Sequence, residues 1–315
     1  MQLFTSMLVL ALIYATPIII AATGGLYSER SGVTNIAIEG IMTIGAFVAG
    51  TVVPLTEGRL GLWAPWLGIF LAAIFGMLFS VLHAYISIDL MGDQTISGTA
   101  LNMLSLGLSV YFCQIIFHQQ RTEAFGRGFV KTTVPVLSDI PVLGPLLFTR
   151  IYVTFYLAIA IVIATYIILW KTPYGLRLRA AGEHPSAVDS LGISVRKLRY
   201  SGVLISGFLA GLAGGIMLLT MATQFNAGSI HGVGFISLAA LIFGRWNPWG
   251  VLGASIFFGF SQILSIYSRD IVLFANVPEE IFYAVPYALT ILAMLAFSRK
   301  SAAPAADGIP YKSSR

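Results

Sequence analysis

The amino-acid sequence predicts an all-α protein that crosses a membrane many times as a polytopic transmembrane helix bundle. Two observations support this prediction. Of the 315 residues, 57% are hydrophobic and only 10% are charged, whereas soluble domains usually carry about 25% charged residues. The apolar residues also gather in stretches of about 20 residues, the length that a helix needs to cross a bilayer core. A soluble protein with a large core is excluded, because this chain has too few polar residues to cover its surface.

We expect about nine membrane-spanning helices, with a range of eight to ten. In chain order, the apolar stretches are residues 3–23, 35–55, 62–82, 94–118, 150–170, 200–222, 232–246, 249–268 and 279–298. They form one transmembrane domain over residues 1–298, and the Ala, Pro and Ser content of the tail at 299–315 predicts disorder. The first stretch lacks the basic start and the cleavage site of a signal peptide, so we expect it to be retained as a helix.

Basic residues in the connections predict the orientation. The loop 171–199 contains six Lys and Arg residues against two acidic residues, and the tail carries four more basic residues. Short loops rich in Lys and Arg stay in the cytoplasm, so we expect this loop and the C terminus inside, and the N terminus and the loop 119–149 outside. Arg121, Arg127 and Lys131 in the outer loop argue against this orientation. Because the basic residues lie beside the spans, the net charge of +5 does not indicate a nucleic-acid partner.

A row of glycines within residues 201–215 predicts close helix packing. Gly207, Gly211 and Gly215 recur every four residues and therefore share one face of a helix. Small residues at this spacing let two helix backbones approach closely, which is a main source of packing energy in lipid. We interpret the row as a packing face within the bundle, and a contact with a partner subunit is the alternative.

Polar residues within the apolar stretches are candidates for a solute path. Asn102 belongs to a stripe of small polar residues on one side of the helix predicted at 94–118, and such a stripe must face protein or water rather than lipid. Glu39 is the most unusual of these residues, because an acid within a span is costly and is by default functional. The alternative is that Glu39 lies near the cytoplasmic end of its helix, where it pairs with Arg30 or caps a backbone break near Gly40.

Two further candidates follow the stretch 200–222 toward the outer face. Gln224 and Phe225 place an amide beside an aromatic ring, which suits a planar polar solute. Together with Asn35, they complete the candidate solute path of Asn35, Glu39, Asn102, Gln224 and Phe225.

No pattern in the sequence predicts catalysis or a metal site. The four histidines lie at loop or span-end positions, and the chain has neither a His-Glu-x-x-His motif nor paired intramembrane aspartates. The glycine-rich P-loop that binds ATP is missing as well. We therefore expect a transport protein that is not an enzyme and holds no catalytic residue, metal or cofactor of its own.

The loop 171–199 contains a short helix that needs something to pack against. Pro185 is typical of a helix start, and Gly192 of its end. The helix between them has less than two turns, so it is not stable alone in water. The apolar side chains that it has to bury are Ala187, Val188 and Leu191. Either the helix folds against the ends of its own spans, or it docks in a groove of a cytoplasmic partner and passes motion to the bundle.

Four stretches of the sequence carry a resemblance to a known family. They are residues 25–47 with Ser28-Glu-Arg-Ser-Gly32, residues 97–102, the loop stretch Gly182-Glu-His-Pro185, and residues 234–250. The loop resembles the coupling segment of ABC-importer permeases, in the group that includes simple-sugar, branched-chain amino-acid and nucleoside systems. The amino-terminal stretch is most similar to the nucleoside branch, whose binding lipoproteins belong to the basic-membrane-protein family.

The resemblance implies a complex in a bacterial inner membrane, surrounded by membrane lipid. This chain would pair with a second, related permease subunit and with an ATP-binding subunit that holds ATP and Mg, and an extracytoplasmic substrate-binding lipoprotein would deliver the solute. Coupling to the ATPase would run through the loop 171–199. For ATP to drive transport, the ATPase has to contact this loop differently in the two states of the permease. The coupling residues that the resemblance implies are Glu183, Pro185, Ala187, Val188 and Leu191.

Nucleosides are the expected cargo. A sugar, a branched-chain amino acid or riboflavin is the alternative within the same importer class. A stand-alone carrier or channel without an ATPase is the second alternative.

Overall fold

The structure is a computed structural model, and it describes residues 2–135, 138, 140, 144–267 and 303–312. The ninth apolar stretch predicted from the sequence, residues 279–298, lies outside the described residues. So do the two ends of the tail, residues 299–302 and 313–315.

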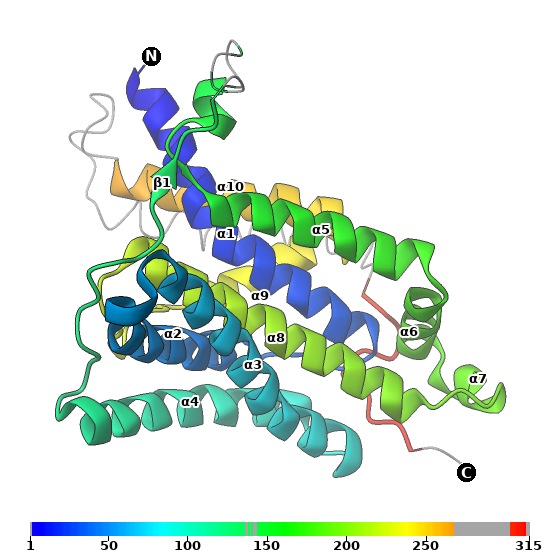
Figure 1. Ribbon diagram of the computed structural model, residues 1–315. Helices are drawn as coiled ribbons and strands as arrows, with labels where there is room; N and C mark the ends of the chain where they lie inside the picture. Colours follow the sequence, from blue (N-terminus) through cyan, green and yellow to red (C-terminus); the bar gives the residue numbers. More distant parts are fainter. Residues whose placement is uncertain (1, 136–137, 139, 141–143, 268–302, 313–315) are drawn as a thin grey trace.

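The described chain is built almost entirely of α-helices (Figure 1). In chain order they are α1 (Gln2–Arg30), α2 (Ile38–Leu60), α3 (Ala64–Ala84), α4 (Gln94–Phe117), α5 (Val153–Lys171), α6 (Pro173–Glu183), α7 (Pro185–Ser190), α8 (Val195–Met221), α9 (Val233–Phe243) and α10 (Pro248–Ile266). Short 3-10 or π-helical turns lie at Gly61–Trp63, Tyr85–Asp89 and Gly144–Phe148. The two-residue strands β1 (Lys131–Thr132) and β2 (Ile151–Tyr152) pair antiparallel between α4 and α5.

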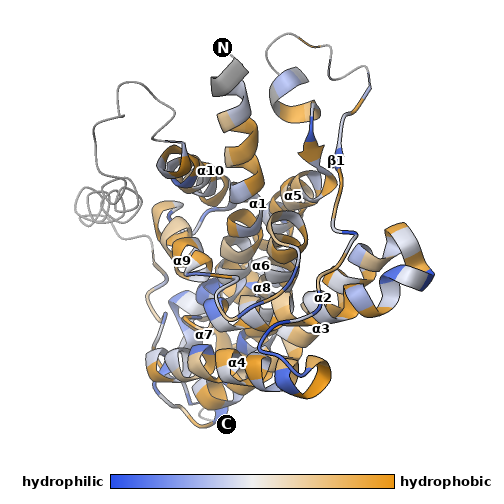
Figure 2. Cartoon of the chain, turned by 90° about the vertical axis from the view of Figure 1, so that its left-hand side faces the viewer, coloured by the Kyte–Doolittle hydropathy of each residue, from blue (hydrophilic) through white to orange (hydrophobic). Residues whose placement is uncertain are grey.

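Six stretches of described helix are long and apolar enough to cross a membrane. They are Thr5–Arg30, Ile38–Asp89, Gln94–Phe117, Val153–Lys171, Val195–Met221 and Pro248–Ile266. The stretch Ile38–Asp89 contains both α2 and α3, which pack against each other. Figure 2 shows hydrophobic residues along the helices and hydrophilic residues mainly in the connections. The protein is therefore a polytopic, all-α membrane protein, as its composition predicts.

The connections gather at two opposite ends of the bundle (Figure 1). One end, which we name the outer end, holds the N terminus and the connection between α4 and α5. The opposite end, which we name the inner end, holds α6, α7 and the described C-terminal segment 303–312. The predicted orientation also places the loops 119–149 and 171–199 on opposite sides.

Helix α8 lies at the centre, with α1, α2 and α3 packed around it. A methyl group on Gly211 would lie 2.3 Å from the carbonyl oxygen of Ala72, and one on Gly214 would lie 2.0 Å from that of Met42. Gly207 and Gly215 face α3 in the same way. The glycine row therefore lies against helices of this same chain. The backbones of α8 and its neighbours approach so closely there that a larger residue would clash.

Helix α9 crosses only part of the bundle. Its 11 residues span about 16 Å at 1.5 Å per residue, which is half of the ~30 Å of a bilayer core. Residues 222–232, which precede it, start at the outer end, and Trp246, which follows it, contacts α1 at the inner end. In the part of the chain that the structure describes, the predicted stretch 232–246 is therefore a helix too short to cross a bilayer core by itself.

The inner end differs from the sequence prediction in two respects. The loop 171–199 contains two helices rather than one, because Thr172 and Pro173 start α6: the Thr172 hydroxyl accepts a hydrogen bond from the Gly175 N–H, and Pro173 occupies the first helical position. The prediction of a disordered tail is wrong for residues 303–312. They make hydrogen bonds to four other parts of the chain, so their Ala and Pro content is a feature of an extended, docked segment.

Candidate functional site: a broken-helix junction and a coupling end

The backbone breaks between α1 and α2, and an amide side chain satisfies the break. Residues 31–37 are not helical, and α2 begins at Ile38. The Gly40 N–H donates to Asn102 Oδ1 over 2.7 Å, and Asn102 Nδ2 donates to the Ile36 carbonyl over 3.0 Å. The polar stripe of α4 therefore faces this break, and Asn102 serves backbone groups that a helix start leaves unpaired.

The start of α9 meets the start of α2 at Glu39. The two carboxylate oxygens accept hydrogen bonds from the Gly232 and Gly234 N–H groups, each over 2.7 Å. Helix N-termini carry partial positive charge, and a carboxylate there is favourable. Glu39 thus caps the backbone of α9 and holds two half-buried helix starts together. The sequence offered Arg30 or a backbone break near Gly40 as structural partners of Glu39; in the structure Arg30 instead contacts Glu183 and the Trp246 carbonyl.

The junction lies at the depth of the middle of α4. A methyl group on Gly40 would lie 2.7 Å from Ser105 Oγ, and Ser105 is in the central part of the 24-residue α4. Asn35 is fully buried beside it and donates from Nδ2 to Ser206 Oγ over 2.9 Å. The Asn35 Oδ1 has no hydrogen-bond partner among the described residues. A buried amide oxygen without a partner is costly, which makes this position a candidate site for a polar ligand or water.

A small cavity of about 150 Å³ adjoins the start of α9. Its lining comes from α1, α8, α9 and α10 and combines apolar side chains with Tyr14, His231 and Gln262. His231 precedes the Gly232 that Glu39 caps, so the cavity and the junction share one segment of backbone.

Gln224 and Phe225 lie apart from this junction, at the outer end. The Phe225 N–H donates to Thr122 Oγ1 over 3.0 Å, and its carbonyl accepts from the Thr122 N–H over 3.1 Å. Its fully buried ring packs edge-on against Phe47, with centroids 5.8 Å apart. Phe225 therefore anchors the outer connections together, and Gln224 is half-buried beside it.

At the inner end, α7 buries only one side. Val188 is 4% exposed and Asp189 is buried, whereas Leu191 is 77% exposed. Pro185 is half-buried at the first helical position, and Ala187 is exposed. Of the three apolar side chains that the sequence expects this helix to bury, only Val188 is buried within this chain. A helix of six residues has a single inward face, and Val188 and Asp189 occupy it.

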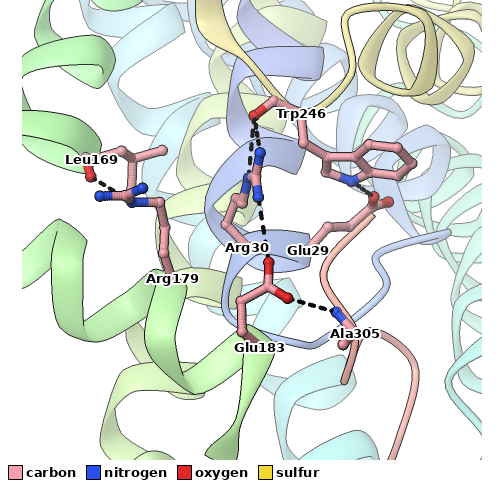
Figure 3. Close-up of polar contacts among 7 residues, drawn as sticks. All are labelled: Glu29, Arg30, Leu169, Arg179, Glu183, Trp246 and Ala305. Carbon is pink, nitrogen blue, oxygen red and sulfur yellow. Dashed lines mark hydrogen bonds and ion pairs between the residues drawn. The ribbon is translucent and has the colours of Figure 1, made fainter. Parts of the chain in front are cut away.

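Glu183 ends α6 in a group of polar contacts with α1 and the segment 303–312 (Figure 3). Its carboxylate lies 3.8 Å from Arg30 Nη1 and accepts a hydrogen bond from the Ala305 N–H over 3.2 Å. Arg30 also donates from Nη2 to the Trp246 carbonyl over 2.9 Å, and the Trp246 indole donates to Glu29. The coupling candidate Glu183 is thus already linked, through Arg30, to the end of α9.

Other residues of the site gave weak signals in the sequence. Gly232 and Gly234 bring their N–H groups to Glu39; Gly234 opens the stretch 234–250 that carries the family resemblance, but its contact with Glu39 was not predicted. Arg199 is 1% exposed, although its place in a basic loop suggested a charge facing water. Asp89 accepts two hydrogen bonds from Arg196 and one from Tyr200, which joins the turn Tyr85–Asp89 after α3 to the start of α8. The described residues contain no group of three or more metal-ligating side chains.

The comparisons with known proteins assign the chain to a family. Residues 7–294 match the family described as the branched-chain amino acid transport system, permease component. The chain belongs to this family. It is therefore a permease component, a transport subunit without a catalytic role, which confirms the resemblance that its loops carry.

Individual relatives cover nearly the whole chain. The guanosine ABC transporter permease protein NupQ of Bacillus subtilis (strain 168) is 46% identical over 310 residues, or 98% of this chain and 97% of the relative. The nucleoside ABC transporter permease protein NupC of Lactococcus lactis subsp. cremoris (strain MG1363) is 42% identical over 304 residues, or 96% of each. The guanosine ABC transporter permease protein NupP of the same Bacillus is 27% identical over 269 residues, or 84% of this chain and 74% of the relative.

Proposed function

We propose that this chain is the membrane-spanning permease subunit of an ATP-driven importer of nucleosides. The observation that carries the proposal is its identity of 42–46%, over nearly full length, with two permeases named for guanosine and for nucleosides. The matched regions cover 98% and 96% of this chain.

The junction is the part of the bundle best suited to a gate on the solute path. Two helix starts meet there, in the middle of the membrane, and broken helices with free backbone groups are typical of solute sites in transporters. Asn35, Glu39 and Asn102 surround it, so these three remain our candidates for the path. Gln224 and Phe225 contribute at the outer mouth, where the half-buried amide of Gln224 is accessible to solute arriving from outside.

We further propose that α7 is the point at which the ATP-binding subunit moves this chain. Leu191 follows α7 at the inner end and is 77% exposed, so its side chain is available for an apolar contact with a partner. From α7, the path of contacts runs through Glu183 and Arg30 to the turn after α9. The proposed coupling residues are those named from the sequence: Glu183, Pro185, Ala187, Val188 and Leu191.

The proposed assembly contains four kinds of component. A second, related permease completes the translocation path, and the occurrence of two permeases named for guanosine in one Bacillus, NupQ and NupP, supports such a pair. An ATP-binding subunit supplies ATP and Mg, and an extracytoplasmic lipoprotein delivers the solute. In this proposal the chain has about nine spans in a bacterial inner membrane, with the loop 171–199 and the C terminus in the cytoplasm.

Reconstitution tests the proposal. The chain is purified from native membranes with its associated subunits, placed in liposomes, and assayed for uptake of radiolabelled guanosine, ribose and leucine. We expect uptake of guanosine that requires ATP on the cytoplasmic side and the binding lipoprotein. Uptake of ribose or leucine in its place would overturn the cargo, and uptake by this chain alone without ATP would overturn the importer.

A further inference from the structure

The C-terminal segment 303–312 lies across the inner end of the bundle, next to α6 and α7 (Figure 1). It is extended or turned rather than helical, with Gly308 at φ +74°. Its hydrogen-bond partners outside the segment are more than 100 residues away in the sequence. Because an extended segment gains little from its own backbone hydrogen bonds, its position has to be explained by contacts with the rest of the chain.

On one side, the segment contacts the coupling region. The Ala306 N–H donates to the Gly182 carbonyl over 2.8 Å, and the Ala305 N–H donates to Glu183 over 3.2 Å (Figure 3). Further along, the Tyr311 hydroxyl donates to Asp189 Oδ2 over 3.1 Å. These bonds reach the last turn of α6 and the inward face of α7, so the segment holds both helices of the loop 171–199.

On its other side, the same segment contacts the bundle. Arg199 of α8 donates from Nη1 to the Ile309 carbonyl over 2.9 Å, and the Thr34 hydroxyl donates to Asp307 Oδ1 over 3.2 Å. Thr34 lies in the break between α1 and α2, a few residues before the Glu39 junction. The segment thus joins the coupling helices to the two parts of the bundle that lead to the proposed gate.

We propose that segment 303–312 is a positioning segment for coupling: it seats α7 against α8 and the break at residues 31–37, so that movement of α7 reaches the gate. The inference rests on the proposed function. Its physical basis is that α7 has only six residues and is not stable alone. Val188 and Asp189 are its inward anchors, and the second of these is held by Tyr311. Without the segment, α7 keeps only its other contacts with the bundle, among them the path through Glu183 and Arg30, so a smaller part of its movement reaches the gate.

Two variants of the full complex test this role. Tyr311→Phe removes one hydroxyl from α7 and keeps the ring, and a chain ending at residue 302 removes the whole segment. Lys312→Ala is the matched control, because Lys312 is exposed beside Tyr311. For each complex in liposomes, we would measure subunit stoichiometry, ATP hydrolysis, and the number of guanosine molecules imported per ATP hydrolysed.

We expect all three complexes to assemble and to hydrolyse ATP. Import per ATP falls roughly two- to tenfold in Tyr311→Phe, the effect of one lost hydrogen bond, falls further in the shortened chain, and stays unchanged in Lys312→Ala. An unchanged ratio in the first two variants overturns the proposal. So does loss of the ATP-binding subunit from the shortened chain, which would make the segment an assembly element. Failure of the proposed function itself is distinguishable, because it appears as wild-type complex that imports no guanosine with ATP.

Discussion

Two glutamates on α2 make the same kind of contact in different surroundings. Glu39, in the first turn, accepts hydrogen bonds from the Gly232 and Gly234 N–H groups in the middle of the bundle. Glu57, near the other end of the helix, accepts from the Gly126 and Arg127 N–H groups at the outer end, at 3.0 and 3.1 Å. Both carboxylates therefore join α2 to a distant stretch of backbone.

The difference between them lies in what replaces the carboxylate. At the outer end, water reaches the backbone donors and substitutes for a lost side chain at little cost. At Glu39 the donors lie between packed helices and are half-buried, so water replaces the carboxylate less easily there, and a shielded polar group without a partner is costly. The same kind of hydrogen bond therefore contributes little to stability at Glu57 and much more at Glu39. Location decides how much free energy is lost when one of these contacts is broken.

The largest effect is expected from removing Glu39. Glu39→Ala leaves two half-buried N–H groups without an acceptor, at about 1–3 kcal/mol each if water does not replace the carboxylate, so we expect a loss of up to about 6 kcal/mol in the free energy of unfolding. Glu57→Ala, the matched control, should cost less than about 1 kcal/mol. Thermal unfolding of both variants in one detergent checks this, and equal shifts in Tm would contradict the role given to location.

The next effect concerns the close approach of the α8 and α3 backbones at Gly211. Gly211→Ala forces a methyl group to within 2.3 Å of the Ala72 carbonyl oxygen, whereas Gly107 on α4 has no atom within 4 Å of the same position. We expect overpacking of about 1–3 kcal/mol in the first variant. Gly107→Ala should be neutral or slightly stabilising, since Ala favours the helix. Yield of folded monodisperse protein and its Tm are the measurements, and a tolerated Gly211→Ala paired with a harmful Gly107→Ala would reverse the account of α8.

A smaller effect depends on pH at the inner end. Burial raises the pKa of Asp307 from 3.8 to about 6, although the Thr34 hydroxyl and Arg199 favour its charged form. The docked segment therefore keeps a proton that the free segment releases, so its docking is strongest below pH 4 and weakens as pH rises through 6. The carboxyl of Glu29 also interacts with Asp307. Hydrogen exchange of residues 303–312, corrected for intrinsic rates, should show less protection at pH 7 than at pH 4.5.

The control for this pH effect is Asp307→Asn, which keeps an acceptor for Thr34 and cannot ionise. In this variant the difference in protection between the two pH values should disappear. Persistence of the full difference would show that another group titrates, and would remove Asp307 from the explanation.

The smallest effect is expected at Glu183. Its carboxylate is 46% exposed and its distance to Arg30 Nη1 is 3.8 Å, so Glu183→Gln should change the free energy of unfolding by less than about 1 kcal/mol. If Glu183 serves coupling, import per ATP should fall while Tm stays the same. A large drop in Tm would instead make Glu183 a structural residue like Glu39.

The sequence predicted those features that depend on one helix at a time. Composition and apolar length indicated the class of fold, and the spacing of Gly207, Gly211 and Gly215 predicted a face that does lie against α3. The family resemblance of four short stretches was confirmed by the match over residues 7–294. Each of these signals is carried by residues close together in the chain.

Features that need two distant segments were beyond such signals. The acceptor role of Glu39 depends on Gly232 and Gly234, almost 200 residues away. The donors are backbone N–H groups, which every residue except proline has, so the sequence does not reveal them. The order of residues 303–312 depends on Arg199 and Asp189, because an Ala- and Pro-rich segment has no preference for a fold by itself. For the same reason, the sequence could not predict that Phe225 lies at the outer end, paired with Thr122, whereas Asn35 lies beside the Glu39 junction.

The central claim is that an ATP-binding subunit drives this permease through α7, and Leu191 tests it most directly. Leu191→Glu changes a side chain that is 77% exposed, so the fold should be unaffected, and Leu191→Met keeps an apolar contact as the control. In reconstituted complexes we predict that ATP-dependent guanosine uptake falls at least tenfold with Leu191→Glu and stays near wild type with Leu191→Met. Undiminished uptake with Leu191→Glu, in a complex of normal composition, would contradict the account.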